Sequence, residues 1–329
     1  MKDSFIYARS MLLGLSLLFF SGCSFISVSL MPAVEPFEET TVMGTGKDKI
    51  LIVDISGIIS DEGKHGLVFL SDEPNTVSRI KEELTTAAQD DSIKAILLRI
   101  NSPGGTVTAS DIIYHEIEQF KKASGLPVIA CIMDLGVSGG YYVAVSADKI
   151  VAHPTTVTGS IGVIMLHLSV EGLMQKIGVA DTSIKTGEHK DMGSPFKTMT
   201  EEEQKIFHGV LDDMYQKFLA VIVKNRPGLS MEKLRPLADG RIYTARQALE
   251  FGLIDQIGYL DDAVSLAKEA AGLTAARVII YHRPGAYKNN IYSQLGATGT
   301  GIESFNLINV DLKTFVKSGA PSFMYLWSP

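Results

Sequence analysis

Two glycine-rich turns carry residue types that could hold and activate a nucleophile. Asn101-Ser-Pro-Gly-Gly105 follows an apolar run that ends at Ile100, and Ser138-Gly-Gly-Tyr-Tyr142 follows a run that ends at Met133. A glycine inside a helix costs about 1 kcal/mol relative to alanine, so an adjacent pair indicates that another group approaches the backbone closely. If a helix opens after Ser138, this serine lies among free N–H groups that could stabilise an acyl-transfer oxyanion.

Each turn alone has a simpler interpretation. Two glycines after a strand most often form a tight turn. A phosphate-binding loop is another alternative, although neither turn has the GxGxxG or GxxxxGK[ST] spacing. Together the turns favour a catalytic site, because each follows a strand and each could offer backbone donors to one oxygen.

A serine nucleophile needs a base, and the sequence offers both histidine and lysine candidates. His153, downstream of Ser138, is the candidate for a Ser–His pair. Lys185 and Lys190 share a second polar segment, Lys185-Thr-Gly-Glu-His-Lys-Asp191. A lysine base must be neutral, so its pKa must fall from about 10.4 towards 7–8 through burial away from carboxylates. The residues alone leave these candidates open.

The bulk properties exclude several classes of protein. A net charge of −7 without a long basic run argues against a nucleic-acid partner. The two cysteines, Cys23 and Cys131, are too few for a disulfide framework, and neither lies in a metal-ligand spacing. With 46% hydrophobic and 20% charged residues, the chain has the composition of an ordinary globular protein.

The elements that must position these residues alternate between strands and helices. Continuous apolar runs predict buried strands at residues 50–55, 93–100 and 128–133. Apolar residues at three- and four-residue steps predict helices around Ile80 and Ile117. Capping boxes predict two further helix starts, at Thr200 with Glu203 and at Thr244 with Gln247. The alternation indicates an α/β fold built from βαβ units. From Tyr281 onward the periodicity is lost, and His282 is assigned to this irregular tail.

The N-terminal segment has the pattern of an export signal. Lys2 and Arg9 precede an apolar stretch, residues 11–20, that ends in Ser21-Gly22-Cys23. Phe20-Ser-Gly-Cys23 resembles a bacterial lipobox, which predicts a lipoprotein signal peptide at residues 1–22 and a lipid on Cys23.

The alternative is an uncleaved membrane anchor. The segment stays mostly apolar to Val34, which is about the length that spans a bilayer. Residues 23–48 are assigned as a tether, and under either interpretation the remainder faces away from the cytoplasm. A buried helix fits poorly, since no polar face interrupts the run.

The order and spacing of several motifs resemble those of the signal peptide peptidase A family. These motifs are the three segments quoted above together with Thr158-Gly-Ser-Ile-Gly162, Gly240-Arg-Ile-Tyr-Thr-Ala245 and Gly252-Leu-Ile-Asp-Gln-Ile-Gly258. The resemblance covers residues 49–272, predicted as one peptidase domain, and it is to the short, single-domain bacterial form. Residues 273–329 are left as a C-terminal extension of unknown role.

The resemblance implies a role for five residues. Ser138 matches the nucleophile and Lys190 the general base, while Ser160 matches the serine whose hydroxyl hydrogen-bonds the lysine amine. Gly104 and Gly139 match the backbone donors of the oxyanion hole.

The resemblance also decides among the candidate general bases, and it implies no cofactor and no metal. Lys185 is the nearest competitor, and Lys190 is favoured for its position before Asp191. His153 falls where the family does not require histidine, so it is interpreted as structural.

The same resemblance implies a fold similar to the Clp protease proteolytic subunit and the crotonases, a repeated ββα superhelix with C-terminal helical segments. It further implies a ring-shaped homo-oligomer in which serine and lysine come from neighbouring subunits. The expected substrates are cleaved signal peptides and other apolar peptides, and the expected location is the bacterial cell envelope, membrane-anchored, on the extracytoplasmic side. Two other functions stay open: a crotonase-like enzyme acting on acyl-thioesters, and a non-catalytic membrane-associated scaffold.

Overall fold

The computed structural model describes residues 36–62, 64–65, 72–73, 75–283, 291 and 322–327. The predicted signal peptide and Cys23 lie outside the described residues. The strands are β1 (Glu38–Gly44), β2 (Lys49–Ser56), β3 (Lys64–His65), β4 (Asp72–Glu73), β5 (Ile93–Ser102), β6 (Gly104–Thr106), β7 (Val128–Val137), β8 (Lys149–Ala152), β9 (Val157–Gly159), β10 (Ile164–Leu166), β11 (Ile242–Thr244), β12 (Gln256–Ile257), β13 (Arg277–His282) and β14 (Ser322–Leu326). The helices are α2 (Thr76–Ala87), α3 (Val107–Ser124), α4 (Gly139–Ala144), α5 (Glu171–Ile177), α6 (Glu201–Asn225), α7 (Met231–Leu234), the 3-10 helix η1 (Arg235–Leu237), α8 (Ala245–Glu250) and α9 (Leu260–Ala270).

A mostly parallel sheet forms the centre of the compact unit that comprises residues 35–65 and 73–329. Among the described residues it has nine strands, ordered β1-β13-β2-β5-β7-β8-β12, with β9 beside β7 and β11 beside β9. The two antiparallel pairings are β1 with β13 and β11 with β9. Strands β1 and β13 thus belong to the sheet although they lie outside the predicted domain limits of 49–272.

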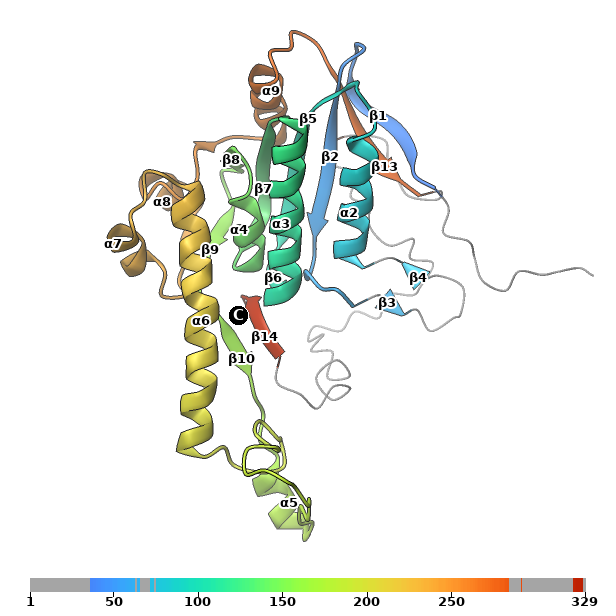
Figure 1. Ribbon diagram of the computed structural model, residues 1–329. Helices are drawn as coiled ribbons and strands as arrows, with labels where there is room; N and C mark the ends of the chain where they lie inside the picture. The colour runs from blue at the N-terminus through green and yellow to red at the C-terminus, as the bar shows by residue number, and fades with distance from the viewer. Residues whose placement is uncertain are drawn as a thin grey trace, which may run out of the picture. The chain divides into compact units, whose positions relative to one another are not determined.

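Helices cover both faces of this sheet (Figure 1). Helices α2, α3 and α4 pack on one face, and the C-terminal part of α6 adds Phe218, Leu219 and Ile222 to the same core. Helix α9 covers the other face, where Leu260, Ala263 and Val264 pack against β2, β5 and β7. Because both faces are covered, the central strands are continuous apolar runs rather than alternating ones.

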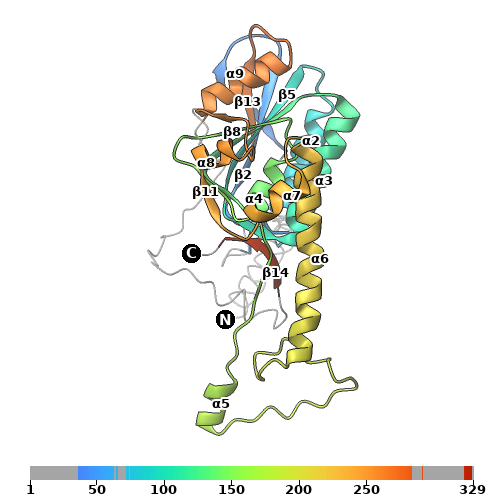
Figure 2. The same cartoon turned by 90° about the vertical axis from the view of Figure 1, so that its left-hand side faces the viewer.

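A second, three-stranded sheet lies next to the two glycine-rich turns. Its order is β10-β14-β6, and both pairings are antiparallel. Strand β6 contains Gly104 and Gly105, and β10 follows Ser160 closely in the sequence. Figure 2 shows β14 below α4 and beside α6. The second sheet therefore borders the two glycine-rich turns.

The strongest local sequence signals are confirmed. Helix α6 begins after Thr200, whose side chain accepts from Glu203 N while Glu203 accepts from Thr200 N. Helix α8 begins after Thr244 with the same reciprocal pair, completed by Gln247. Each box satisfies two N–H groups that would otherwise lack partners, which is why it predicts a helix start so well.

The assignment of His282 to an irregular tail is wrong. His282 is the last residue of β13 and is buried, with Nε2 2.9 Å from Thr40 Oγ1. Strand β13 is short and its residues are buried in succession, so it has no alternating pattern by which the sequence could reveal where it ends.

Within the described ranges, no helix combines the length and the apolar character needed to cross a membrane.

Candidate active site

Ser138 sits on a sharp connection between the central strand β7 and helix α4. It is the N-cap of α4, with φ 54° and ψ −118°, and it is 1% exposed. Its N–H donates to the Gly159 carbonyl at 2.8 Å. A non-glycine residue at positive φ costs about 1–3 kcal/mol and persists where the surroundings hold it, often at functional sites. The strand, the helix and this hydrogen bond together hold Ser138 in place.

Ser160 lies directly beside Ser138. Strands β7 and β9 pair in parallel, with Val137 opposite Gly159, so the two serines follow adjacent strand ends. Ser160 also has a positive φ, 50°, and within the described chain these two serines are the non-glycine residues with that conformation. Ser160 N donates to the Arg241 carbonyl at 2.7 Å, and the residue is 7% exposed.

The glycine pair after Ser138 is explained by close backbone approach, as the sequence predicts. A Cβ on Gly139 would lie 2.4 Å from Ser110 Oγ, and one on Gly140 would lie 2.8 Å from the Ser102 carbonyl oxygen. Real Cβ atoms do not approach other atoms this closely. The pair therefore lets α4 pack against α3 and the end of β5.

Gly104 faces Gly139 across the site. It has φ 101°, and a Cβ there would lie 2.8 Å from Gly139 N and 2.0 Å from the Tyr325 carbonyl oxygen. Its own N–H donates to Ser102 Oγ at 3.0 Å. Gly139 N lies in the first turn of α4, where N–H groups have no acceptor within the helix. The Gly139 amide is thus the open donor, and the Gly104 amide is shared with Ser102.

The expected base, Lys190, lies apart from these groups in one chain. It is on the exposed loop between α5 and α6, and its side chain makes no hydrogen bond to Ser138 or Ser160. In Figures 1 and 2 this loop lies beyond the lower end of α6, whereas α4 lies beside the sheet. The structure thus brings four of the five predicted residues together and leaves the lysine outside.

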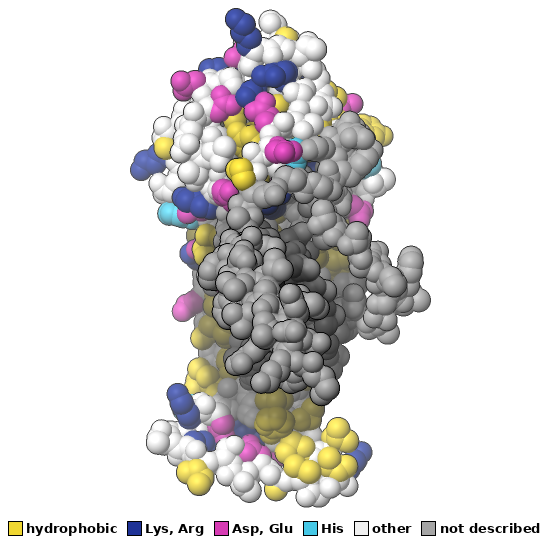
Figure 3. All heavy atoms as spheres, turned by 90° about the vertical axis from the view of Figure 1, so that its right-hand side faces the viewer, with side chains coloured by type: hydrophobic (Ala, Val, Ile, Leu, Met, Phe, Trp, Pro, Cys, Tyr) yellow, Lys and Arg dark blue, Asp and Glu magenta, His cyan; other side chains and the backbone are white. Residues whose placement is uncertain are grey.

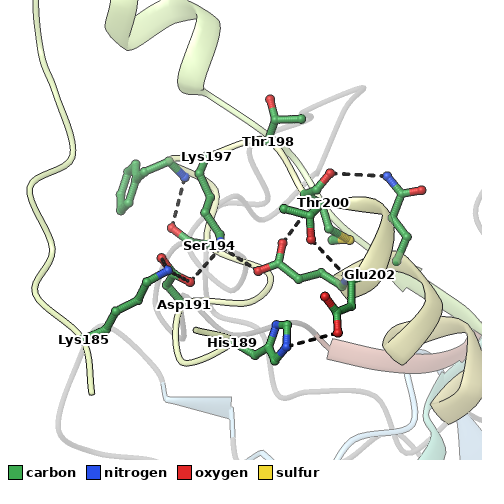
Figure 4. Close-up of polar contacts among 12 residues, drawn as sticks. Lys185, His189, Asp191, Ser194, Lys197, Thr198, Thr200 and Glu202 are labelled. Atoms are coloured by element: carbon green, nitrogen blue, oxygen red, sulfur yellow. Dashed lines mark hydrogen bonds and ion pairs between the residues drawn. The ribbon is translucent and has the colours of Figure 1, made fainter. Parts of the chain in front are cut away.

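The rival lysine has a different environment (Figure 4). Lys185 Nζ lies 2.8 Å and 2.7 Å from the two carboxylate oxygens of Asp191. Lys197 Nζ contacts the same carboxylate at 2.7 Å, and these hydrogen bonds lower the pKa of Asp191 to about 2. The Asp191 carboxylate is thus shared between Lys185 and Lys197. Lys190 makes no such ion pair with the residues that the structure describes.

The side chain of His153 contacts Thr155 and Tyr259 rather than Ser138. Its Nδ1 is 2.9 Å from Thr155 Oγ1, and its ring packs edge-on against Tyr259 with the centroids 4.9 Å apart. It lines a cavity of about 290 Å³ together with Asp54, Arg99 and Asp134. These contacts are those of a structural histidine on a loop.

In the described ranges, no group of three or more His, Cys, Asp or Glu side chains is placed so that it could hold a metal ion. Cys131 is buried in β7, and burial raises the pKa of its thiol to about 12. It is therefore a core residue and not a nucleophile at neutral pH.

Comparisons with known proteins identify relatives of this chain. The peptidase family S49 profile matches residues 120–274. A protein of Enterococcus faecium named signal peptide peptidase SppA is 39% identical over 244 residues, which are 74% of this chain and 70% of that protein. Protease 4 of Haemophilus influenzae is 36% identical over 68% of this chain and 35% of its own length. The chloroplastic serine protease SPPA of Arabidopsis thaliana is 30% identical over 78% of this chain and 38% of its own length.

The chain belongs to the signal peptide peptidase A family. It is therefore a serine peptidase with a mixed α/β fold.

Strand β14, a segment for which the sequence predicted no role, lies beside this site. Strand β14 contacts Gly104 and Gly139 through the Tyr325 backbone, and Tyr325 is fully buried. Its ring packs on Tyr142 of α4 and Phe218 of α6. The sequence signal was the apolar run Phe323-Met-Tyr-Leu326, but nothing in it indicates which strands it pairs with.

Proposed function

We propose that this serine peptidase is a membrane-tethered endopeptidase that degrades cleaved signal peptides and other apolar peptides through a Ser138–Lys190 dyad. The observation that carries the proposal is the placement of Ser138, held at positive φ at the start of α4 beside Ser160 and the Gly139 amide. A nucleophile so placed has oxyanion donors and a second hydroxyl within its immediate surroundings.

The proposed mechanism is acyl transfer. Neutral Lys190 takes the proton of the Ser138 hydroxyl, and the serine oxygen attacks the scissile carbonyl carbon. The amides of Gly139 and Gly104 hold the resulting oxyanion, which requires the Ser102 hydroxyl to release its bond with Gly104 N. Lys190 then protonates the leaving amine, and water releases the acyl group from Ser138. Ser160 orients the lysine amine through its hydroxyl.

The separation of Lys190 from Ser138 supports a shared site. We propose that a ring-shaped homo-oligomer supplies Lys190 from the neighbouring subunit. Contact with a neighbour would also bury the amine, which lowers a lysine pKa.

The surface around the α5 loop fits such a contact. Leu168, Leu173, Ile177 and Ile184 are exposed there by 60% or more. Figure 3 shows apolar side chains gathered at the lower end of the molecule, where α5 lies. A second copy of the chain would remove this surface from water, which is favourable at about 25 cal/mol per Å².

Mixing two inactive variants tests the shared dyad directly. Ser138→Ala retains the lysine and Lys190→Ala retains the serine, so a mixed ring contains some sites with both groups. For random assembly of equal amounts, about a quarter of the sites should be complete. Recovery of peptidase activity near that fraction supports the proposal. Absence of recovery, with mixed rings demonstrated by mass, would show that the dyad does not form across subunits.

The fold and the tether complete the proposal. The succession of β2, β5 and β7, each followed by a helix on one face, fits the Clp protease/crotonase-like superhelix. We place the enzyme in the bacterial envelope, facing away from the cytoplasm and held by a lipid on Cys23, with an uncleaved anchor as the alternative. Incorporation of a radiolabelled fatty acid that is lost in Cys23→Ser supports the lipid. An unlabelled protein that retains residues 1–22 would indicate the anchor.

A further inference from the structure

The loop between α5 and α6 holds Lys190 within a series of tight turns. Its N–H donates to the Gly187 carbonyl at 3.1 Å, and two further turns of the same kind follow, at His189–Met192 and Asp191–Ser194. These turns fix the local backbone but do not attach it to the rest of the protein. Because a lysine side chain is long and flexible, its amine is held in one place only if the backbone that carries it is anchored.

Ion pairs attach this loop to the first turn of α6 (Figure 4). Lys197 Nζ lies 2.7 Å from Asp191 Oδ1 and 2.6 Å from Glu203 Oε1. One ammonium group therefore joins the residue that follows Lys190 to the helix. The other carboxylate oxygen of Glu203 accepts from Thr200 N at 2.9 Å, as part of the capping box, so this glutamate is fixed from two sides.

The three charged side chains of this link are more buried than an ordinary surface ion pair. The Glu203 side chain is 2% exposed, and those of Lys197 and Asp191 are 23% and 20% exposed. Hydrogen bonds from Lys197 and from the Thr200 N–H lower the pKa of Glu203, so its carboxylate is charged at neutral pH. A single exposed ion pair contributes little to stability, whereas charges that form a network with fixed geometry contribute more.

The residue before Lys190 is held to the same turn of the helix. His189 Nε2 lies 3.7 Å from a carboxylate oxygen of Glu202, which precedes Glu203 in α6. Helix α6 is itself fixed in the hydrophobic core at Phe218, roughly 20 Å farther along its axis at about 1.5 Å per residue. Both sequence neighbours of Lys190 are thus attached through α6 to the core, while Lys190 is exposed.

We propose that the link formed by Asp191, Lys197 and Glu203 positions Lys190 for proton transfer by holding its loop against the start of α6. The inference rests on the Ser138–Lys190 dyad proposed above. A general base acts only within hydrogen-bond distance of the proton it takes, and a misplacement of about 1 Å can cost about 10²-fold in rate. Because the amine has to reach a serine of the neighbouring subunit, the orientation of its loop decides whether it arrives within that distance.

A matched pair of lysine variants tests this positioning role. Lys197→Met and Lys185→Met each remove one cation from Asp191, but only the first also breaks the connection to Glu203. On a fluorogenic apolar peptide, Lys197→Met should lower kcat by about 10- to 100-fold with little change in KM, and Lys185→Met should stay within about threefold of the unaltered chain. Lys197→Arg keeps the charge and can contact both carboxylates, so it should recover most of the loss.

The mass of the assembled full-length protein and its unfolding in urea show whether the variants assemble and fold alike. Equal losses of kcat in Lys197→Met and Lys185→Met would overturn the inference, because the effect would then follow the charge on Asp191 and not the connection to α6. A loss of kcat that accompanies loss of the assembled mass would assign the link to assembly and would also overturn it.

The variant Lys190→Ala separates failure of this inference from failure of the proposed dyad. If Lys190→Ala is inactive while Lys197→Met keeps full activity and full KM, the dyad stands and the positioning role fails. If Lys190→Ala is itself active, the dyad fails whatever the Lys197 variants do.

Discussion

Substitution of Gly104 by alanine tests the oxyanion geometry without touching the nucleophile. The new Cβ would lie 2.8 Å from Gly139 N and 2.0 Å from the Tyr325 carbonyl oxygen, at a φ of 101° that side chains rarely adopt. The methyl group would therefore occupy the space in which the oxyanion must sit. Loss of one oxyanion donor typically reduces kcat by about 10² to 10³, or roughly 3–4 kcal/mol, and we expect a reduction of at least this size.

Gly125→Ala provides the matched control for backbone strain. Gly125 also has a positive φ, 68°, at the end of α3, but a Cβ there meets nothing within 4 Å. Both substitutions should lower the free energy of unfolding by about 1–3 kcal/mol through strain. Only Gly104→Ala should also lower kcat/KM on a fluorogenic peptide, because only its methyl group enters the site. Urea unfolding and steady-state kinetics on the two full-length variants measure these quantities. Equal kcat/KM values for the two variants would refute the placement of the oxyanion at Gly104 and Gly139.

The remaining predictions concern the base, the histidine and a buried carboxyl group. Lys190→Ala should nearly abolish peptidase turnover, whereas Lys185→Ala, which removes an ion pair with Asp191, should retain most of it; the reverse result in kinetics would move the base to Lys185. His153→Ala should keep its activity in the same assay, and loss of activity there with retention in Lys190→Ala would replace the dyad by a Ser–His pair. Glu83 is buried, and burial, partly offset by Arg79, raises its pKa from 4.5 to about 7. The fold therefore gains stability from protonated Glu83 that is fully present below pH 4.5 and is lost as the pH rises through about 7, on the order of 3 kcal/mol. Unfolding measured between pH 5 and 8 should show this loss in the unaltered chain and in the Glu82→Gln control but not in Glu83→Gln; an unchanged pH profile in Glu83→Gln would contradict the assignment.

The local parts of the fold and site were predictable because their signals are local. Apolar runs predicted the strands that became β2, β5 and β7. The capping boxes predicted the starts of α6 and α8, since the pairing residues lie three positions apart. The glycine pair after Ser138 predicted close backbone approach, and Ser110 and Ser102 supply the approaching atoms.

The parts that could not be predicted depend on contacts between distant segments. Strand β14 pairs with β6 and β10, which precede it by more than 150 residues, and strand pairing is set by tertiary packing. The pocket around Tyr325 joins Tyr142 of α4 to Met214 and Phe218 of α6, whose spacing indicates only an apolar helix face. The proposed pairing of Lys190 with Ser138 would be a property of an assembly, and one chain's sequence does not specify how copies meet.

Covalent labelling of Ser138 tests the central claim most directly. Full-length protein treated with a fluorophosphonate should gain one adduct mass, and peptide mapping should place it on Ser138. Labelling should disappear in Ser138→Ala, and its rate should fall in Lys190→Ala because the serine is then not deprotonated. An adduct on another residue, or equal labelling of Ser138 with and without Lys190, would contradict the account.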